Sequence, residues 1–314
     1  MTAVTTRTLR IGTRRSPLAL VQATEVANVL RGAGHEVELV EVVTEGDRSA
    51  AALPDLGGTG VFVTEVRRRL LAGDVDLAVH SLKDLPSRQP DDVALAAVPE
   101  RADPRDALVS RDGAGLSGLA PGSRVATGSP RRAGQLRALG LGIEVVGIRG
   151  NVDTRIRKIA EGAADAAVLA AAGLVRLGRL AEASELLDPG QMLPAPGQGA
   201  LAVECRAAET DLQAELAAAL DDPTTRAAVT AERELLAALE AGCSAPIGAL
   251  ADVSTGDDGP DEIYLRAVAA AVDGARTIRL SRTGPVADAA LLGRQLAAEL
   301  LAEGAAELMG GVAR

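Results

Sequence analysis

A short strand, a threonine and a Ser-Pro pair that starts a helix occur twice in this chain, and this repeat constrains the fold more than any other feature. The first copy runs from Arg10 to Pro17 and the second from Arg124 to Pro130. In each copy Ser supplies the helix N-cap and Pro takes the first helical position. Further strands are expected at 37–43 and 77–80, and again at 143–148 and 166–169. Because strands alternate with helices in both halves, we predict two similar α/β domains with mostly parallel sheets; a chance likeness of short segments is the alternative.

The C-terminal part has a different pattern. After a strand at 200–205 that we expect to return to the first domain, the apolar spacing predicts a helix at 224–239, strands near 247–253, 263–272 and 277–283, and a helix at 286–301. The segment Gly256-Asp257-Asp258-Gly259 is typical of a turn between antiparallel strands. The pattern predicts a smaller α/β domain with an antiparallel sheet.

Bulk properties exclude several classes of protein. The formal net charge is -10, whereas nucleic-acid binding needs a basic surface. No apolar run reaches the roughly 20 residues that cross a bilayer, and the N-terminus lacks an apolar signal core. The two cysteines, Cys205 and Cys243, make no disulfide framework, and no Cys/His spacing matches a zinc site. We expect a cytoplasmic protein that binds no nucleic acid, membrane or metal.

The second Ser-Pro helix start carries two adjacent arginines, Arg131 and Arg132, just after Ser129. A helix N-terminus has free N–H groups and a partial positive charge, so it favours anions. Cations there oppose the helix dipole. Either both side chains are solvated, at a small cost, or an anion binds beside them. Two adjacent arginines behind a Thr-Gly-Ser loop favour the anion.

Other arginines follow predicted strands. Arg149 and Arg155 flank the start of a helix with Asn151 as its expected N-cap, and Arg176 follows the strand at 166–169. The carboxyl ends of parallel strands form the usual ligand crevice of such folds. Because arginine binds carboxylates bidentately, these residues predict a pocket for several carboxylates, although phosphate is equally allowed.

Two residues in expected loops have side chains suited to chemistry. Asp84 follows the strand at 77–80, where a carboxylate beside a basic wall can stabilise a cation; as a turn residue before Pro86 it would have no such role. Cys243 stands between small residues and is expected to be accessible, although a loop cysteine is often only a small residue. Cys205 is expected to be a buried strand thiol.

Six segments, in one order, resemble the porphobilinogen deaminase family. They are TRRSPLAL at 13–20, VHSLKDLP at 79–86, SPRR at 129–132, RGNV at 149–152, PGQG at 196–199 and GCSAP at 242–246. The resemblance runs from about Leu9 to Arg314. It implies a transferase that condenses four porphobilinogen molecules head to tail, with release of ammonia, into linear hydroxymethylbilane. The family builds each product on a covalent dipyrromethane primer.

The resemblance also implies a fold and partners. Two α/β domains would be similar to periplasmic binding proteins: domain 1 with residues 7–102 and 198–220, and domain 2 with residues 103–197. Crossing segments would lie near residues 100 and 197. A third domain, residues 221–314, would carry the cofactor cysteine on a loop facing the cleft. The protein would be a monomer whose product passes to uroporphyrinogen III synthase.

Roles follow from the resemblance residue by residue. The dipyrromethane would be attached through a thioether to Cys243 and held by Lys83, Ser129, Arg131 and Arg132. Five residues, Arg14, Ser16, Arg149, Arg155 and Arg176, would bind the substrate's carboxylates or assist the loss of ammonia. Asp84 would bond the pyrrole N–H groups and stabilise the cationic azafulvene left when ammonia departs, with proton transfer as a second duty.

Two positions depart from the family pattern. Asp55 and Thr59 stand where many members have lysine, and the expected lid at 45–60 keeps only Arg48 as a cation. A role for this lid in binding carboxylates is therefore in doubt. Phe62, the sole phenylalanine, matches an aromatic position near the cofactor region, and a core role is equally open.

Two other functions stay open on the sequence. A non-catalytic anion-binding module would share an arginine-lined cleft but would need neither Cys243 nor Asp84. A cysteine hydrolase would pair Cys243 with His80, because His35 and His80 are the only histidines. The sequence offers that hydrolase no third, orienting group.

Overall fold

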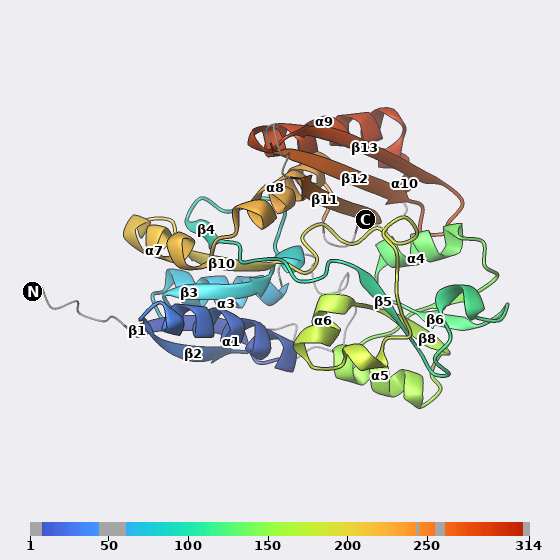
Figure 1. The fold of residues 1–314 in the computed structure, drawn as a ribbon, viewed down its shortest axis with the longest axis horizontal. Helices are drawn as coiled ribbons and strands as arrows, with labels where there is room; N and C mark the ends of the chain where they lie inside the picture. The colour runs from blue at the N-terminus through green and yellow to red at the C-terminus, as the bar shows by residue number, and fades with distance from the viewer. Residues whose placement is uncertain (1–7, 44–60, 243–244, 255–260, 310–314) are drawn as a thin grey trace, which may run out of the picture. The chain divides into compact units, whose positions relative to one another are not determined.

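Two five-stranded sheets with the same arrangement make up most of the fold (Figure 1). The computed structural model describes residues 8–43, 61–242, 245–254 and 261–309, without the side chains of residues 61 and 62. The chain divides into one unit of residues 1–101 and 200–226 and a second of residues 102–199 and 227–314. The division into three domains stays a prediction.

The first unit is built on the sheet β2-β1-β3-β10-β4. Its strands are β1 (Thr8–Arg14), β2 (Glu36–Val42), β3 (Leu77–Ser81), β4 (Val93–Ala97) and β10 (Leu201–Arg206). β1 pairs in parallel with β2 and β3, whereas β10 runs antiparallel to β3 and β4. The predicted return of the chain to this sheet after Gly199 is confirmed. The expectation of a mostly parallel sheet missed the direction of β10.

Helices pack against both faces of this first sheet. They are α1 (Pro17–Gly32), α3 (Val61–Leu71) and α7 (Thr210–Leu220), and a 3-10 turn, η2, spans Leu82–Asp84. α1 and α7 share a buried core with Val79 of β3, whereas α3 packs over Ala78 on the opposite face. Since successive strand residues point to opposite faces, His80 lies on the α3 side.

The second unit contains a sheet of the same design, β7-β6-β8-β5-β9. Its strands are β5 (Asp106–Ser110), β6 (Arg124–Ala126), β7 (Glu144–Val146), β8 (Ala166–Ala170) and β9 (Glu185–Leu186). β6 pairs in parallel with β7 and β8, and β5 runs antiparallel to β8 and β9. In both sheets the antiparallel strand is the first one after the chain crosses from the other unit. This shared topology confirms the two similar α/β folds predicted from the repeat.

The helices of this sheet carry most of the predicted arginines. They are α4 (Pro130–Ala138), α5 (Val152–Ala160) and α6 (Ala171–Arg176), with 3-10 turns η3 (Leu116–Gly118) and η4 (Leu180–Glu182). Ser129 caps α4 by accepting from Arg132 N, and Asn151 caps α5 by accepting from Thr154 N, as predicted. Both caps place arginines at the starts of helices that follow β6 and β7.

The second unit also holds the predicted antiparallel sheet, β11-β12-β13. Its elements are α8 (Pro223–Ala238), β11 (Ile247–Ser254), β12 (Glu262–Ala270), β13 (Thr277–Pro285), η5 (Val286–Asp288), α9 (Ala289–Ala302) and α10 (Ala305–Met309). It has a buried core of its own, which includes Leu265 and Leu296. α4 packs closely against the end of β12. A Cβ added to Gly134 would stand only 2.7 Å from the carbonyl oxygen of Ala271, the residue that follows β12.

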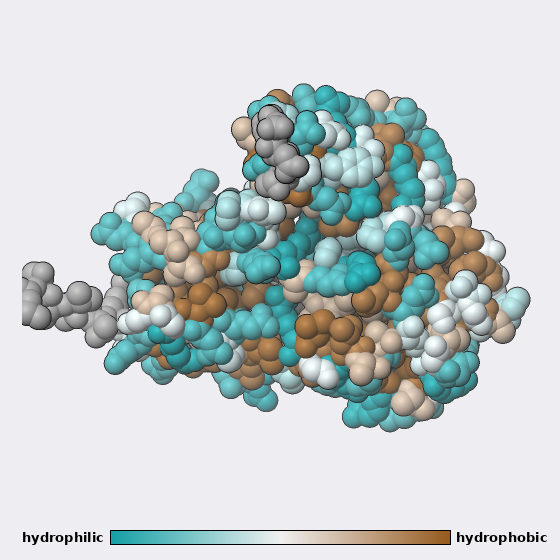
Figure 2. Space-filling model, in the orientation of Figure 1, coloured by the Kyte–Doolittle hydropathy of each residue, from teal (hydrophilic) through white to brown (hydrophobic). Residues whose placement is uncertain are grey.

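Apolar and hydrophilic residues alternate over the surface. Figure 2 shows apolar patches between hydrophilic residues on the face drawn, including one over α6. Exposed large apolar side chains occur on several elements, among them Val29, Leu71, Val175 and Leu291. Within the described residues, no helix combines the length and the apolar content of a membrane span. The same residues contain no group of three or more His, Cys, Asp or Glu side chains arranged to hold a metal ion.

Candidate active site

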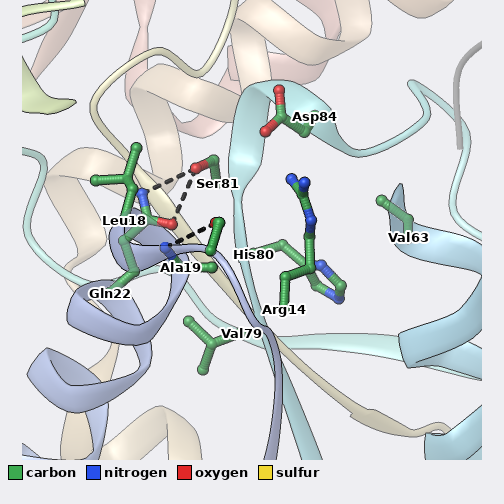
Figure 3. Close-up of a pocket in the computed structure, with 10 residues that line it drawn as sticks. Arg14, Leu18, Ala19, Gln22, Val63, Val79, His80, Ser81 and Asp84 are labelled. Carbon is green, nitrogen blue, oxygen red and sulfur yellow. Dashed lines mark hydrogen bonds between the residues drawn. The ribbon is translucent and has the colours of Figure 1, made fainter. Parts of the chain in front are cut away.

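A pocket lies at the ends of β1 and β3 in the first unit (Figure 3). β1 ends at Arg14, and Ser16 then caps α1 by accepting a hydrogen bond from Ala19 N at 3.4 Å. β3 ends at Ser81 and continues into η2, whose last residue is Asp84. Because β1 and β3 are parallel neighbours, Arg14 and Asp84 reach the same edge of the sheet.

Arg14 and Asp84 face each other across this pocket. In Figure 3 the guanidinium of Arg14 lies between the imidazole of His80 and the carboxylate of Asp84. Asp84 is exposed and Arg14 is half-buried, so both can meet a ligand from solvent. The structure therefore brings together three residues singled out in the sequence: Arg14, Ser16 and Asp84. Lys83, the neighbour of Asp84 in η2, is half-buried.

Gln22 also belongs to this pocket and was not predicted from the sequence. Its side chain is buried and lines the pocket, and its Nε2 donates to Ser81 Oγ at 2.8 Å. This bond ties α1 to the end of β3, just before Asp84. No local pattern marks Gln22, because it is one polar residue on the buried face of a helix.

Behind the pocket lies a buried charge network that the sequence analysis also missed. Glu204 of β10 is fully buried and accepts from Arg67 Nη2 at 2.6 Å, Arg67 Nε at 2.9 Å and Gln89 Nε2 at 2.7 Å. Glu204 Oε2 also stands 3.5 Å from His80 Nε2. The network links α3 to the sheet beneath the pocket.

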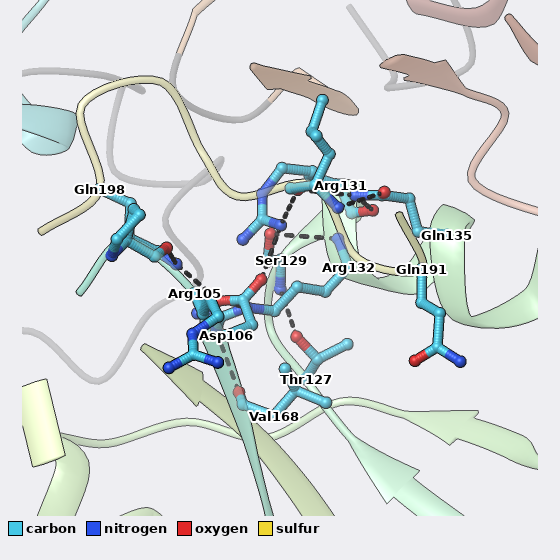
Figure 4. Close-up of polar contacts among 12 residues, drawn as sticks. Arg105, Asp106, Thr127, Ser129, Arg131, Arg132, Gln135, Val168, Gln191 and Gln198 are labelled. Carbon is cyan, nitrogen blue, oxygen red and sulfur yellow. Dashed lines mark hydrogen bonds and ion pairs between the residues drawn. The ribbon is translucent and has the colours of Figure 1, made fainter. Parts of the chain in front are cut away.

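The second unit holds a separate cluster around Asp106 of β5 (Figure 4). Asp106 Oδ2 accepts from Arg131 Nη1 at 2.8 Å, and Oδ1 accepts from Arg132 Nη2 at 2.7 Å. Gln198 Nε2 donates to the same Oδ1 at 2.8 Å. Arg131 and Arg132 are only 3% and 6% exposed, so the solvated alternative is wrong. The anion that the structure places beside them is the carboxylate of Asp106, a residue of the chain itself.

The charges in this cluster do not cancel. Burial acts to raise the pKa of Asp106, but the charges of Arg131 and Arg132 outweigh burial and hold the pKa well below its ordinary value. One carboxylate therefore faces two buried guanidinium groups. Arg131 Nε is also buried without a hydrogen-bond partner in the described part of the chain. A buried cation with an unused donor favours a second anion at this place.

A further arginine group lies where α5 begins. Arg155 Nε donates to the carbonyl oxygen of Gly150 at 2.8 Å. Burial, followed by the charges of Arg132 and Arg149, lowers the pKa of Arg155 to about 10. Arg149 itself is exposed. The structure thus brings Arg155 into electrostatic contact with both Arg132 and Arg149.

Arg176, at the end of α6, bonds to the backbone of the same unit. Its Nη2 donates to the carbonyl oxygen of Gly199 at 3.2 Å, within the segment that precedes β10. Arg176 is half-buried. Its described bond is thus to the backbone where the chain leaves the second unit.

The structure describes one of the two cysteines, Cys205, but not Cys243. Cys205 is fully buried in β10, as predicted, and burial raises its pKa to about 11. Cys243 lies outside the described residues. On either side of it, the carbonyl oxygen of Gly242 accepts from Ala245 N at 2.9 Å. The expected lid with Arg48, Asp55 and Thr59, and the side chain of Phe62, also lie outside the described residues.

Comparison with solved structures finds low similarity to ligand-binding proteins. The BvgS VFT2 domain of Bordetella pertussis matches with a TM-score of 0.40 and 18% identity, covering 67% of this chain and 91% of that one. The L-cystine solute receptor of Neisseria gonorrhoeae in the unliganded open conformation matches with a TM-score of 0.40 and 14% identity, covering 68% and 86%. At these scores the likeness has no bearing on function.

Comparison with protein families and curated proteins is far more specific. The family model described as porphobilinogen deaminase, dipyromethane cofactor binding domain, matches residues 9–214, and the porphobilinogen deaminase C-terminal domain matches residues 226–302. Porphobilinogen deaminase 1 of Streptomyces avermitilis is 58% identical, covering 96% of this chain and 97% of the relative. Porphobilinogen deaminase of Mycobacterium tuberculosis is 56% identical, covering 97% and 99%. These matches favour an enzyme over a non-catalytic anion-binding module, and the chain belongs to the porphobilinogen deaminase family.

Proposed function

We propose that Asp84 carries the charge-stabilising step of this family's reaction, the condensation of four porphobilinogen molecules into linear hydroxymethylbilane. The observation that supports this role is the Arg14–Asp84 pocket at the ends of β1 and β3. It combines an exposed carboxylate with a basic side chain. A pyrrole that carries acetate and propionate groups, and that becomes cationic during the reaction, needs both.

In each condensation one C–N bond and one C–H bond break, and one C–C bond forms. The C–N bond of the substrate's aminomethyl group breaks, ammonia leaves, and the remaining methylene pyrrole is a delocalised cation. Asp84 accepts hydrogen bonds from the pyrrole N–H and places its negative charge beside that cation. The methylene carbon would then bond to the free α-carbon of the pyrrole at the end of the chain, and that carbon would lose its proton. Asp84 is placed to take part in that proton transfer. Release of the product would break the C–C bond that joins its first unit to the primer: the primer α-carbon would regain a proton, and the freed methylene carbon would take up hydroxide from water.

The residues present fit the dipyrromethane cofactor of the family. Bound there, the group supplies the terminal pyrrole to which the first substrate unit is added. Ser129, Arg131 and Arg132, with Lys83, would hold its carboxylates, and Cys243 would attach it. The supporting observation is the positive excess around Asp106, together with the unused Nε donor of Arg131. The carboxylates of the cofactor would supply the anion that this cluster favours.

One backbone segment, Leu193 and Pro194, contacts both this cluster and β11, the strand that follows Cys243 in the sequence. The carbonyl oxygen of Leu193 accepts from Arg131 Nη1 at 2.6 Å, and the next residue, Pro194, accepts from Ala249 N at 2.9 Å. Ala249 belongs to β11, which begins four residues after Cys243. This connection within the second unit supports a shared site for Arg131 and a group attached to Cys243.

The remaining arginines would bind the substrate and the growing chain. Arg14 and Ser16 would receive the carboxylates of the incoming porphobilinogen, and Arg149, Arg155 and Arg176 those of the units already added. Burial, and then the positive charges of Arg132 and Arg149, lower the pKa of Arg155, and this supports its part. A bound carboxylate would relieve this repulsion.

The family's small-molecule substrate is porphobilinogen. We further propose that the protein acts in the cytoplasm as a monomer and passes its product to uroporphyrinogen III synthase. The net charge of -10 supports a soluble single chain. Light scattering on the purified protein should give a mass near 32 kDa. A stable dimer would contradict the proposed monomeric state.

Mass spectrometry of the intact protein tests the proposed function directly. The wild-type chain should carry an added mass of two pyrrole units, and Cys243→Ser should abolish both this mass and turnover. Cys205→Ser is the matched control: it removes the other cysteine, which is buried in β10, and should keep the adduct. An unmodified wild-type chain with full activity would refute the covalent primer.

A further inference from the structure

His80 occupies an unusual place in the pocket. It is the residue before the end of β3, is only 6% exposed, and lines the pocket with Arg14 and Asp84. In Figure 3 its ring lies below the Arg14 side chain, on the side away from Asp84. The roles assigned above to the pocket residues leave His80 without one.

The only carboxylate within ion-pair distance of this ring, among the described residues, is Glu204. His80 pairs across the sheet with Ala202, so Glu204, two residues further along β10, lies on the same face. His80 Nε2 is 3.5 Å from Glu204 Oε2 and makes no hydrogen bond in the described part of the chain. Arg67 and Gln89 hold Glu204 in place with three hydrogen bonds. The acceptor is therefore fixed, and the nearby ring nitrogen is its available donor.

The surroundings keep this ring neutral. Burial lowers the pKa of His80, and Arg67 and Arg14 act in the same direction, while Glu204 and Asp84 act against them. A neutral imidazole carries one N–H. Because a carboxylate oxygen faces Nε2, the proton belongs on Nε2, and Nδ1 is left as an acceptor.

We propose that His80 is a positioning residue of this pocket: Glu204 fixes its Nε2–H tautomer, and the fixed ring directs the Arg14 guanidinium toward Asp84. The proposal rests on the proposed function of the pocket. A neutral ring suits this place, because an imidazolium would repel both Arg14 and a cationic intermediate beside Asp84. His80 acts through Arg14 and exchanges no proton with the substrate.

Nuclear magnetic resonance of the holoenzyme tests the tautomer without any change at His80. The chain has two histidines, so ¹⁵N-histidine labelling gives two ring spin systems, and His35→Gln assigns them. We expect the His80 ring to be neutral at pH 7 with its proton on Nε2. A proton on Nδ1, or a charged ring at pH 7, would overturn the proposal whatever the protein's activity.

Kinetics with paired substitutions test the positioning role. A glutamine amide can reproduce the Nε2–H of histidine, whereas an asparagine amide reaches only the Nδ1 position. His80→Gln should therefore keep kcat/KM near wild type, while His80→Asn, which cannot make the proposed Nε2–H contact with Glu204, should lower it about tenfold. The loss should appear mainly as a raised KM, because Arg14 binds substrate carboxylates. Equal activity of the two variants, with equal Tm, would contradict the role.

A double substitution separates positioning from general packing. If His80 acts through Arg14, His80→Asn should have little further effect on kcat/KM in an Arg14→Ala background. Full additivity of the two losses would count against the proposal. The primer mass of each variant is measured in parallel. A wild-type chain without primer or turnover would refute the proposed function, whereas the tautomer result would still decide the role of His80.

Discussion

Replacing Asp106 with asparagine should cost far more stability than the loss of an ordinary ion pair. Asp106 is fully buried and accepts hydrogen bonds from Arg131 Nη1, Arg132 Nε, Arg132 Nη2 and Gln198 Nε2. The substitution preserves the volume but leaves two buried guanidinium groups with no negative charge. Removing one partner of a buried pair costs about 3–5 kcal/mol. We expect the free energy of unfolding to fall by about that amount in Asp106→Asn.

The matched control is an exposed pair in the same unit. Asp252, 58% exposed, accepts from Arg266 Nη2 at 2.6 Å. Asp252→Asn should cost at most about 1 kcal/mol, because water screens exposed pairs. Urea unfolding is best followed by far-UV circular dichroism, since the chain has no Trp and one Tyr. If the two variants lost equal stability, the argument from buried charge would be refuted.

The buried carboxylate of Asp106 also predicts how the stability depends on pH. The pKa of Asp106 is lower in the folded chain than in the unfolded chain. Its contribution is therefore complete above the unfolded value, about 3.9, and is lost as the pH falls through the lower folded value. The difference in stability between wild type and Asp106→Asn should stay constant from pH 7 down to about pH 5 and shrink below about pH 4. A difference that vanished near pH 6 would point to a titrating group other than Asp106.

Three further predictions follow from other sites. Asp84→Asn should keep the fold and the primer but lower kcat by about 10²–10³-fold, the scale for losing an electrostatic group at a developing charge; steady-state turnover with mass analysis checks this. Cys205 is buried and its pKa is raised to about 11, so native protein should resist alkylation there until it is unfolded, as peptide mapping would show. Gly199 has φ of +91° and packs against the carbonyl oxygen of Ala102. Gly199→Ala should therefore destabilise the protein by at least about 1–2 kcal/mol, whereas Gly147→Ala, which meets open space, should stay within about 0.5 kcal/mol in the same urea assay.

The sequence predicted those parts of the site that depend on local structure. Ser16, Ser129 and Asn151 were expected to cap helices, and each accepts the expected backbone hydrogen bond. A cap involves residues two or three apart, so the pattern is complete within one segment of the chain. The caps follow strands of two sheets, Ser16 in the first and Ser129 and Asn151 in the second, and each sets the position of its neighbouring arginines.

The partners of the buried charges were beyond the reach of the sequence. Glu204 meets Arg67 across 137 residues, and Asp106 meets Arg132 across 26. Both acids stand in apolar strand segments, where a single carboxylate resembles a strand-end or surface residue. Their pairing depends on the antiparallel entry of β10 and β5, and apolar periodicity does not encode strand direction.

Arg67, Arg132 and Arg155 differ in what holds them, and this difference bears on which of them can respond to a ligand. Arg67 and Arg132 are held by a buried carboxylate of the chain in bonds of 3.1 Å or less, so their positions are set during folding. Arg155 bonds a backbone carbonyl, and the charges that shift its pKa are those of other arginines. A carboxylate bound there removes repulsion rather than competing with an internal partner. Under the proposed function, a pyrrole's acetate or propionate would therefore gain most at Arg155, while Arg132 would contribute a fixed positive potential.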